Sequence, residues 1–113
     1  MREMRRGEIW FGELDPTRGH EQSGRRPVLI ISDAPLNRSR AGLVVIVPLT
    51  TKFKRIPSHV LLAPPEGGVT QESYIKCEEM RSVTKERLDY YMGEVTPDTM
   101  AEVEYHLRYV LRL

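Results

Sequence analysis

Apolar and polar positions along the 113-residue chain predict short strands followed by one helix. Apolar runs, partly alternating, predict strands at residues 8–14, from 27 to about 32, at 43–49, 58–62 and 73–83. The run at 43–49 is the most apolar, so we expect it at the centre of a sheet. Pro27 is expected to be the first residue of its strand, a position that tolerates proline.

The end of the chain predicts the one long helix. Thr96 can cap it, Pro97 fits its first position, and Asp98 complements the positive end of its dipole. Apolar residues then recur at helical spacing, at Met100, Val103, Leu107, Val110 and Leu111. We therefore expect an amphipathic helix of about 15 residues that covers the core. Single helical turns are expected at 34–37 and 84–88.

These elements predict one α+β domain spanning residues 1–113. About five antiparallel strands would curl into a small β-barrel, with the C-terminal helix packed across it. No run of about 18 apolar residues occurs, and the charged N-terminus leads into a strand. We therefore expect no membrane segment, no secretion signal and a cytoplasmic location.

The composition limits which disulfides, metal sites and charged surfaces the chain can form. Cys77 is the single cysteine, which excludes an internal disulfide, and neither it nor the three scattered histidines has partners at metal-ligand spacing. We expect no metal and no cofactor. Residues 1–60 hold 11 Lys and Arg against 6 Asp and Glu, whereas residues 61–113 hold 6 against 10. This asymmetry is compatible with a basic groove on one face of the domain.

Arg26 and Thr50 are the first candidates for chemistry. Arg26 ends a polar loop and precedes the strand that starts at Pro27, whereas Thr50 ends the most apolar strand. If the two strands are antiparallel neighbours, both side chains lie at one edge of the sheet. A guanidinium beside a hydroxyl is a phosphate-binding pair, flanked here by loops 17–25 and 52–55. The alternative is that Arg26 is a surface charge at a strand end.

The same stretches resemble the MazF/PemK family of toxin–antitoxin ribonucleases. The shared blocks are RGEIW at 6–10, EQSGRRPV at 21–28 and VPLTT at 47–51, with further matches at 57–60 and 72–75. The resemblance implies a homodimeric barrel of Src-homology-3 type, which the CcdB gyrase poisons share. It also implies metal-independent, sequence-specific cleavage of single-stranded RNA that leaves 2′,3′-cyclic phosphate and 5′-hydroxyl ends.

The resemblance assigns the family's catalytic arginine to Arg26 and its catalytic threonine to Thr50. Glu21 and Gln22 match loop positions linked to substrate handling, and Ser73 matches a serine near the site. We expect RNA binding by Arg18, His20, Glu21, Gln22, Arg25, Lys52, Lys54, Arg55, His59 and Ser73.

In the expected reaction, the ribose 2′-oxygen attacks the adjacent phosphate, so DNA is not a substrate. Arg26 and Thr50 would stabilise the charge that gathers on the phosphoryl oxygens. The general base stays open, with Glu21 and His59 as candidates. The chain departs from the family at Glu79, where the family has glutamine, and this departure bears on base preference.

A ribonuclease of this family implies a protein inhibitor. We expect an acidic antitoxin, partly disordered when free, that covers the RNA site of the homodimer. The alternative from another class is a non-enzymatic toxin that inhibits a protein such as DNA gyrase through the C-terminal helix. A plain RNA-binding barrel is a third alternative. The eight aromatic residues argue against it, because they do not cluster in a strand as a base-stacking platform would.

Overall fold

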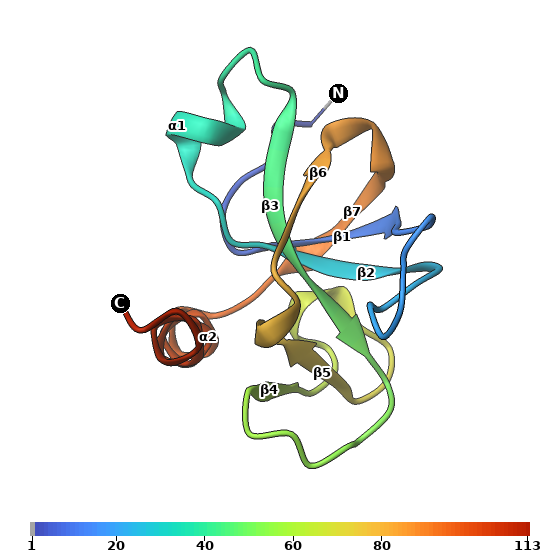
Figure 1. Ribbon diagram of the computed structural model, residues 1–113, viewed down its shortest axis with the longest axis vertical. Coiled ribbons are helices and arrows are strands. Elements are labelled where there is room, and N and C mark those ends of the chain that lie inside the picture. The colour runs from blue at the N-terminus through green and yellow to red at the C-terminus, as the bar shows by residue number, and fades with distance from the viewer. Residues whose placement is uncertain (1) are drawn as a thin grey trace.

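The computed structural model describes residues 2–113, and over this range it has seven strands and two α-helices (Figure 1). The strands are β1 (Glu8–Glu13), β2 (Arg25–Ile30), β3 (Leu43–Thr50), β4 (His59–Leu62), β5 (Ser73–Lys76), β6 (Arg81–Thr84) and β7 (Leu88–Glu94). The helices are α1 (Ala34–Asn37) and α2 (Pro97–Leu111). Three 3₁₀ turns complete the set: η1 (Glu66–Gly68), η2 (Cys77–Glu79) and η3 (Lys85–Arg87).

The strands form one antiparallel sheet with the order β4-β5-β3-β2-β1-β7, and β6 pairs with β3 outside this path. Figure 1 shows β3 running through the middle of the molecule, which confirms its predicted central place. The α+β class with a C-terminal helix is also confirmed, whereas the closed barrel of about five strands is wrong. Because β5 and β6 share one edge of β3, the sheet divides there into two arms and stays open.

The strand predicted at 73–83 is interrupted. Both β5 and β6 run antiparallel to β3, so one segment of chain does follow this edge. However, the register shifts between the pairs Ile75↔Leu49 and Arg81↔Ile46, because the turn η2 inserts extra residues. This insertion works like a β-bulge, and it turns the side chain of Glu78 toward His59 at the start of β4 and that of Glu79 toward Gln22 of the loop between β1 and β2.

The strand β7 is absent from the predicted elements, and β2 starts earlier than predicted. Strand β7 is an edge strand paired only with β1, and two register shifts break the alternation of its buried positions. Strand β2 begins at Arg25, two residues before Pro27, because β1 is long enough to pair with Arg25 through Glu13. Both arginines before Pro27 therefore belong to a strand and not to a mobile loop.

Apolar side chains on the two faces of the sheet form two clusters. One cluster includes Ile9, Leu29 and Val47 and is covered by Val103 and Leu107 of α2. The second cluster lies on the opposite face and includes Trp10, Val28, Ile30, Val44 and Ile46. Because neighbouring residues of β2 and β3 enter different clusters, these strands are buried on both faces, which explains their continuous apolar runs.

The predicted helix starts are confirmed. The Thr96 side chain accepts from the Thr99 amide, and Pro97 occupies the first turn of α2. At the start of α1 the Asp33 side chain accepts from the amide of Ala34, the first residue of the helix. The turn expected at 84–88 is the 3₁₀ turn η3. Over residues 2–113, no helix is both long enough and apolar enough to cross a membrane.

Candidate active site

The pairing of β2 with β3 brings Arg26 and Thr50 to one end of the sheet. The two strands are antiparallel, with Val28 opposite Pro48 and Leu29 opposite Val47. Continuing this register by two residues sets Arg26 opposite Thr50. The sequence prediction of neighbouring antiparallel strands is therefore confirmed, together with the meeting of these two residues at one edge.

Two backbone carbonyl groups hold the Arg26 guanidinium in place. Its Nε donates to the Ser23 carbonyl oxygen over 2.7 Å, and its Nη1 donates to the Leu49 carbonyl oxygen over 3.3 Å. Burial lowers the pKa of Arg26 from its ordinary value, while the negative charges of Glu79 and Asp15 act in the opposite direction. The group stays cationic at neutral pH and leaves an Nη atom for an incoming anion.

The Thr50 hydroxyl is nearly buried and fixed by the backbone. Thr50 is 5% exposed, and its Oγ1 accepts from the Lys52 amide over 3.2 Å. Since the oxygen is engaged as an acceptor, the hydroxyl hydrogen can be donated to a ligand. Ser73 is buried as well, and its Oγ donates to the Gln71 carbonyl oxygen over 3.0 Å.

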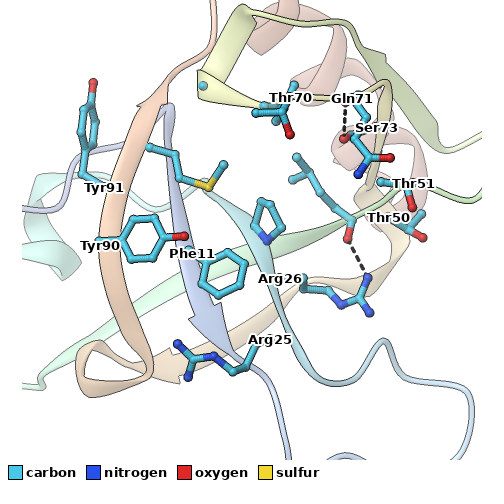
Figure 2. Close-up of a pocket in the computed structure, with 15 residues that line it drawn as sticks. Phe11, Arg25, Arg26, Thr50, Thr51, Thr70, Gln71, Ser73, Tyr90 and Tyr91 are labelled. Atoms are coloured by element: carbon cyan, nitrogen blue, oxygen red, sulfur yellow. Dashed lines mark hydrogen bonds between the residues drawn. The ribbon is translucent and has the colours of Figure 1, made fainter.

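These residues line one open pocket of about 650 Å³ (Figure 2). Of the predicted site residues, Arg25, Arg26, Thr50 and Ser73 contribute to its wall. The wall also contains polar and aromatic residues that sequence reasoning missed: Phe11, Thr51, Thr70, Gln71, Tyr90 and Tyr91. They come from β1, from β7, from the residue after β3 and from the segment after η1, so only the tertiary fold brings them together.

The loop between β1 and β2 is fastened to η2 through Gln22. The Gln22 amide donates to Glu79 Oε1 over 2.6 Å, and Gln22 Oε1 accepts from Lys76 Nζ over 3.0 Å. Lys76 also forms an ion pair with Glu79, and its side chain is only 5% exposed. Both oxygens of Glu79 therefore hold the protein together, and this residue fixes the loop whose Ser23 carbonyl orients Arg26.

The remaining predicted RNA-binding residues lie on surface loops. Arg18, His20 and Glu21 are exposed in the loop between β1 and β2, where Glu21 lies 3.9 Å from Arg81. The exposed residues of the loop between β3 and β4 are Lys52, Lys54 and Arg55. These side chains flank the pocket end of the sheet but are not part of its lining. Arg25 lines the pocket while forming ion pairs with Asp89 and Glu13.

His59 lies outside this pocket. Its Nε2 donates to Glu78 Oε2 over 2.8 Å, and its side chain is 4% exposed. Glu78 accepts a second bond from Ser58 Oγ over 2.7 Å. His59 thus has a structural partner and does not line the pocket that contains Arg26 and Thr50, which argues against it as the base.

The Arg26 guanidinium, fixed by two carbonyl groups, and the buried Thr50 hydroxyl lie at one end of the pocket and are suited to bind and polarise a phosphate. The sequence model of the family described as "PemK-like, MazF-like toxin of type II toxin-antitoxin system" matches residues 5–111 of this chain. The chain belongs to this family. The resemblance found in the sequence is therefore confirmed.

Relatives and solved structures of the PemK/MazF family agree over nearly the whole length. Endoribonuclease MazF9 of Mycobacterium tuberculosis is 34% identical over 97% of this chain and 98% of its own. The crystal structure of MazF from Deinococcus radiodurans has a TM-score of 0.89 at 30% identity, with both chains fully covered. An endoribonuclease from a mycobacterial species, in complex with its cognate antitoxin, has a TM-score of 0.78 at 31% identity, covering 100% of this chain and 97% of its own.

Proposed function

We propose that this chain is the toxin of a type II toxin–antitoxin system and acts as a sequence-specific endoribonuclease on single-stranded RNA. The relatives named endoribonuclease support an RNA-cleaving enzyme. The observation that carries the proposal is the shared pocket of Arg26 and Thr50, which lies at the end of the β2–β3 pair.

Cleavage starts when the 2′-oxygen of a ribose attacks the adjacent phosphorus and the bond to the 5′-oxygen of the next nucleotide breaks. The products are a 2′,3′-cyclic phosphate and a 5′-hydroxyl. During attack, negative charge grows on the two non-bridging oxygens. Arg26 Nη and the Thr50 hydroxyl donate to these oxygens, and the donation strengthens as the charge grows. Because a protein cation supplies the charge, the reaction is metal-independent.

Two protons must also move. A guanidinium whose pKa is ordinarily above about 12 is an inefficient base near neutrality, even though burial lowers the pKa of Arg26. The proton of the 2′-hydroxyl therefore passes to another group or to water, and Glu21 is the remaining side-chain candidate on the neighbouring loop. Donation to the leaving 5′-oxygen falls to Arg26, which already lies at the phosphate in this mechanism.

The active assembly is proposed to be a homodimer. Helix α2 and the C-terminal residue after it carry large apolar side chains that the isolated chain exposes to solvent: Tyr105, Tyr109, Val110, Leu111 and Leu113. A two-fold dimer that covers this face removes apolar area from water. The antitoxin is proposed to be acidic and partly disordered, and to lie over the RNA site. The mycobacterial endoribonuclease solved in complex with its cognate antitoxin supports the existence of an antitoxin partner.

The test is incubation of the purified protein with a long single-stranded RNA in EDTA, with a DNA of the same sequence as the control. The expected result is cleavage of the RNA at a few recurrent sites, with 2′,3′-cyclic phosphate ends, and intact DNA. A requirement for added magnesium, or equal cutting of DNA, would contradict the mechanism. Intact RNA together with inhibited DNA gyrase would favour the non-enzymatic alternative.

A further inference from the structure

Two aromatic residues far apart in sequence form a stacked pair in the pocket wall. Phe11 of β1 lies opposite Tyr90 of β7, and the ring centroids are 5.2 Å apart at an interplanar angle of 15°. Tyr90 is 54% exposed, so much of its ring is accessible. No single strand carries an aromatic platform, so the sequence alone argues against one. The sheet builds one across two strands instead.

Arg25 of β2 lies beside the Phe11–Tyr90 pair in the pocket wall, and these three residues form the aromatic corner of the pocket. Its guanidinium carbon lies 5.4 Å from the centroid of the Phe11 ring. The same guanidinium forms an ion pair with Asp89 and lies 3.9 Å from a Glu13 carboxylate oxygen. One cation therefore faces two carboxylates. This charge balance disfavours both a phosphate and an acidic peptide at the corner, but it does not oppose a neutral planar group.

The aromatic corner and the Arg26–Thr50 end belong to the same pocket, as Figure 2 shows. Strand β1 is two strands away from β3 in the sheet order, which corresponds to about 10 Å at the usual spacing between strands. Gln71 and Thr70 lie on the wall between η1 and β5, where an exposed amide and hydroxyl can bond to the edge of a base. A ligand that reaches from one end to the other needs a charged group at Arg26 and a flat apolar group at Tyr90.

We propose that Phe11, Tyr90 and Arg25 form a nucleobase-stacking subsite for one base of the RNA strand, near the phosphate bound by Arg26 and Thr50. This inference rests on the proposed ribonuclease function and adds a binding determinant to it. The base extends the stack on the free face of Tyr90, where aromatic stacking is tolerant of base identity. The subsite sets affinity and the position of the strand, while Arg26 and Thr50 act on the phosphate.

The experiment first maps a cleavage site with the wild-type protein on a long RNA. Short RNAs around this site then receive a 2′-deoxy nucleotide at the cut position, which blocks attack, and a single abasic residue at each position in turn. Their affinities are measured by fluorescence anisotropy for the wild type and for Tyr90→Ala and Tyr90→Phe. Leu61→Ala is the matched control, because Leu61 is an exposed apolar residue outside the pocket.

In the wild type, an abasic residue at one position is expected to weaken binding about tenfold or more, the usual effect of losing one stacked base. Tyr90→Ala should weaken binding of the intact RNA by a similar factor. In this variant, an abasic residue at that one position should cause no further loss of affinity. Tyr90→Phe keeps the ring and should behave as the wild type, as should Leu61→Ala. On uncut RNA, Tyr90→Ala should raise KM and leave kcat nearly unchanged.

Three outcomes would overturn the subsite while the ribonuclease function stands. One is a wild-type profile in which no abasic position differs from its neighbours. Another is a Tyr90→Ala protein that keeps the same positional penalty, since a pair that only stabilises the sheet would change stability without this coupling. The third is loss of RNA binding in Tyr90→Phe equal to that in Tyr90→Ala. A wild-type protein that cuts no RNA would instead overturn the proposed function itself.

Discussion

The carbonyl oxygen of Leu49 accepts a hydrogen bond from Arg26 Nη1 over 3.3 Å. Continued from its paired residues, the register of β2 and β3 sets Leu49 opposite Pro27, which has no amide hydrogen to donate. The Arg26 guanidinium thus donates to a carbonyl oxygen that faces Pro27, where no backbone amide can donate to it. Pro27, the third residue of β2, therefore leaves this carbonyl oxygen free to accept from Arg26 and helps to hold the guanidinium beside Thr50.

The contact of Glu79 with Gln22 predicts that the Glu79 carboxylate holds the loop between β1 and β2 in place. Glu79→Ala removes the acceptor of the Gln22 amide and leaves the buried Lys76 without its ion pair. We expect hydrogen exchange at the Gln22 amide to become at least about tenfold faster, and kcat to fall because the Ser23 carbonyl no longer orients Arg26. The exposed residue Glu86 provides the control, Glu86→Ala. Unchanged exchange at Gln22 in Glu79→Ala would show that the loop is held by other contacts.

Glu78 predicts a pH dependence of stability. Burial alone would raise the pKa of its carboxyl, but hydrogen bonds from Ser58 and His59 outweigh burial and hold the pKa below the ordinary value of 4.5. The unfolded chain lacks these bonds, so ionised Glu78 stabilises the fold above the ordinary carboxyl pKa. This stability is lost as the pH falls through the lowered folded-state pKa.

Urea unfolding from about pH 6 down to about pH 3 measures this contribution. The free energy of unfolding of Glu78→Gln should fall less steeply with decreasing pH than that of the wild type, and it should already be lower near neutrality. Glu86→Gln, at an exposed position, should follow the wild-type curve. Identical slopes for Glu78→Gln and the wild type would remove Glu78 as the source.

The exposed face of α2 predicts self-association. Tyr109 is 79% exposed, so Tyr109→Glu should leave the monomer folded while introducing a charge into a dimer contact. Light scattering at micromolar concentration should give the dimer mass for the wild type and the monomer mass for the variant. The control is Arg40→Glu, an exposed charge change in the turn after α1. A monomeric wild type, or a dimeric Tyr109→Glu, would argue against this interface.

The sequence predicts the parts of the fold that depend on local signals. The apolar runs of β2 and β3 identify strands buried on both faces, and Thr96 with Pro97 identifies the start of α2. Strand β7 carries no such signal, because it lies at an edge, is half exposed and contains register shifts. The turn η2 is equally hidden, since its effect is a change of register against β3 that only the pairing reveals.

The same distinction applies to the site. Arg26 and Thr50 are predictable because each lies where an apolar strand meets a polar loop, and the two strands follow each other in the sheet. Tyr90 and Gln71 are not predictable in this way, because their place in the pocket depends on β7 and on the segment after η1. Gly68 illustrates the constraint on that segment. Its φ is +77°, and an added Cβ would lie 2.2 Å from the Met92 carbonyl oxygen of β7, so only glycine fits.

The central claim is that Arg26 and Thr50 carry out the chemistry. Single-turnover and steady-state cleavage of one short RNA by the wild type, Arg26→Ala, Thr50→Ala and Arg25→Ala tests it most directly, with circular dichroism to verify folding. We predict that kcat falls at least about a hundredfold for Arg26→Ala and for Thr50→Ala, whereas Arg25→Ala mainly raises KM. Rates near wild type for both Arg26→Ala and Thr50→Ala, or a kcat loss confined to Arg25→Ala, would contradict the account.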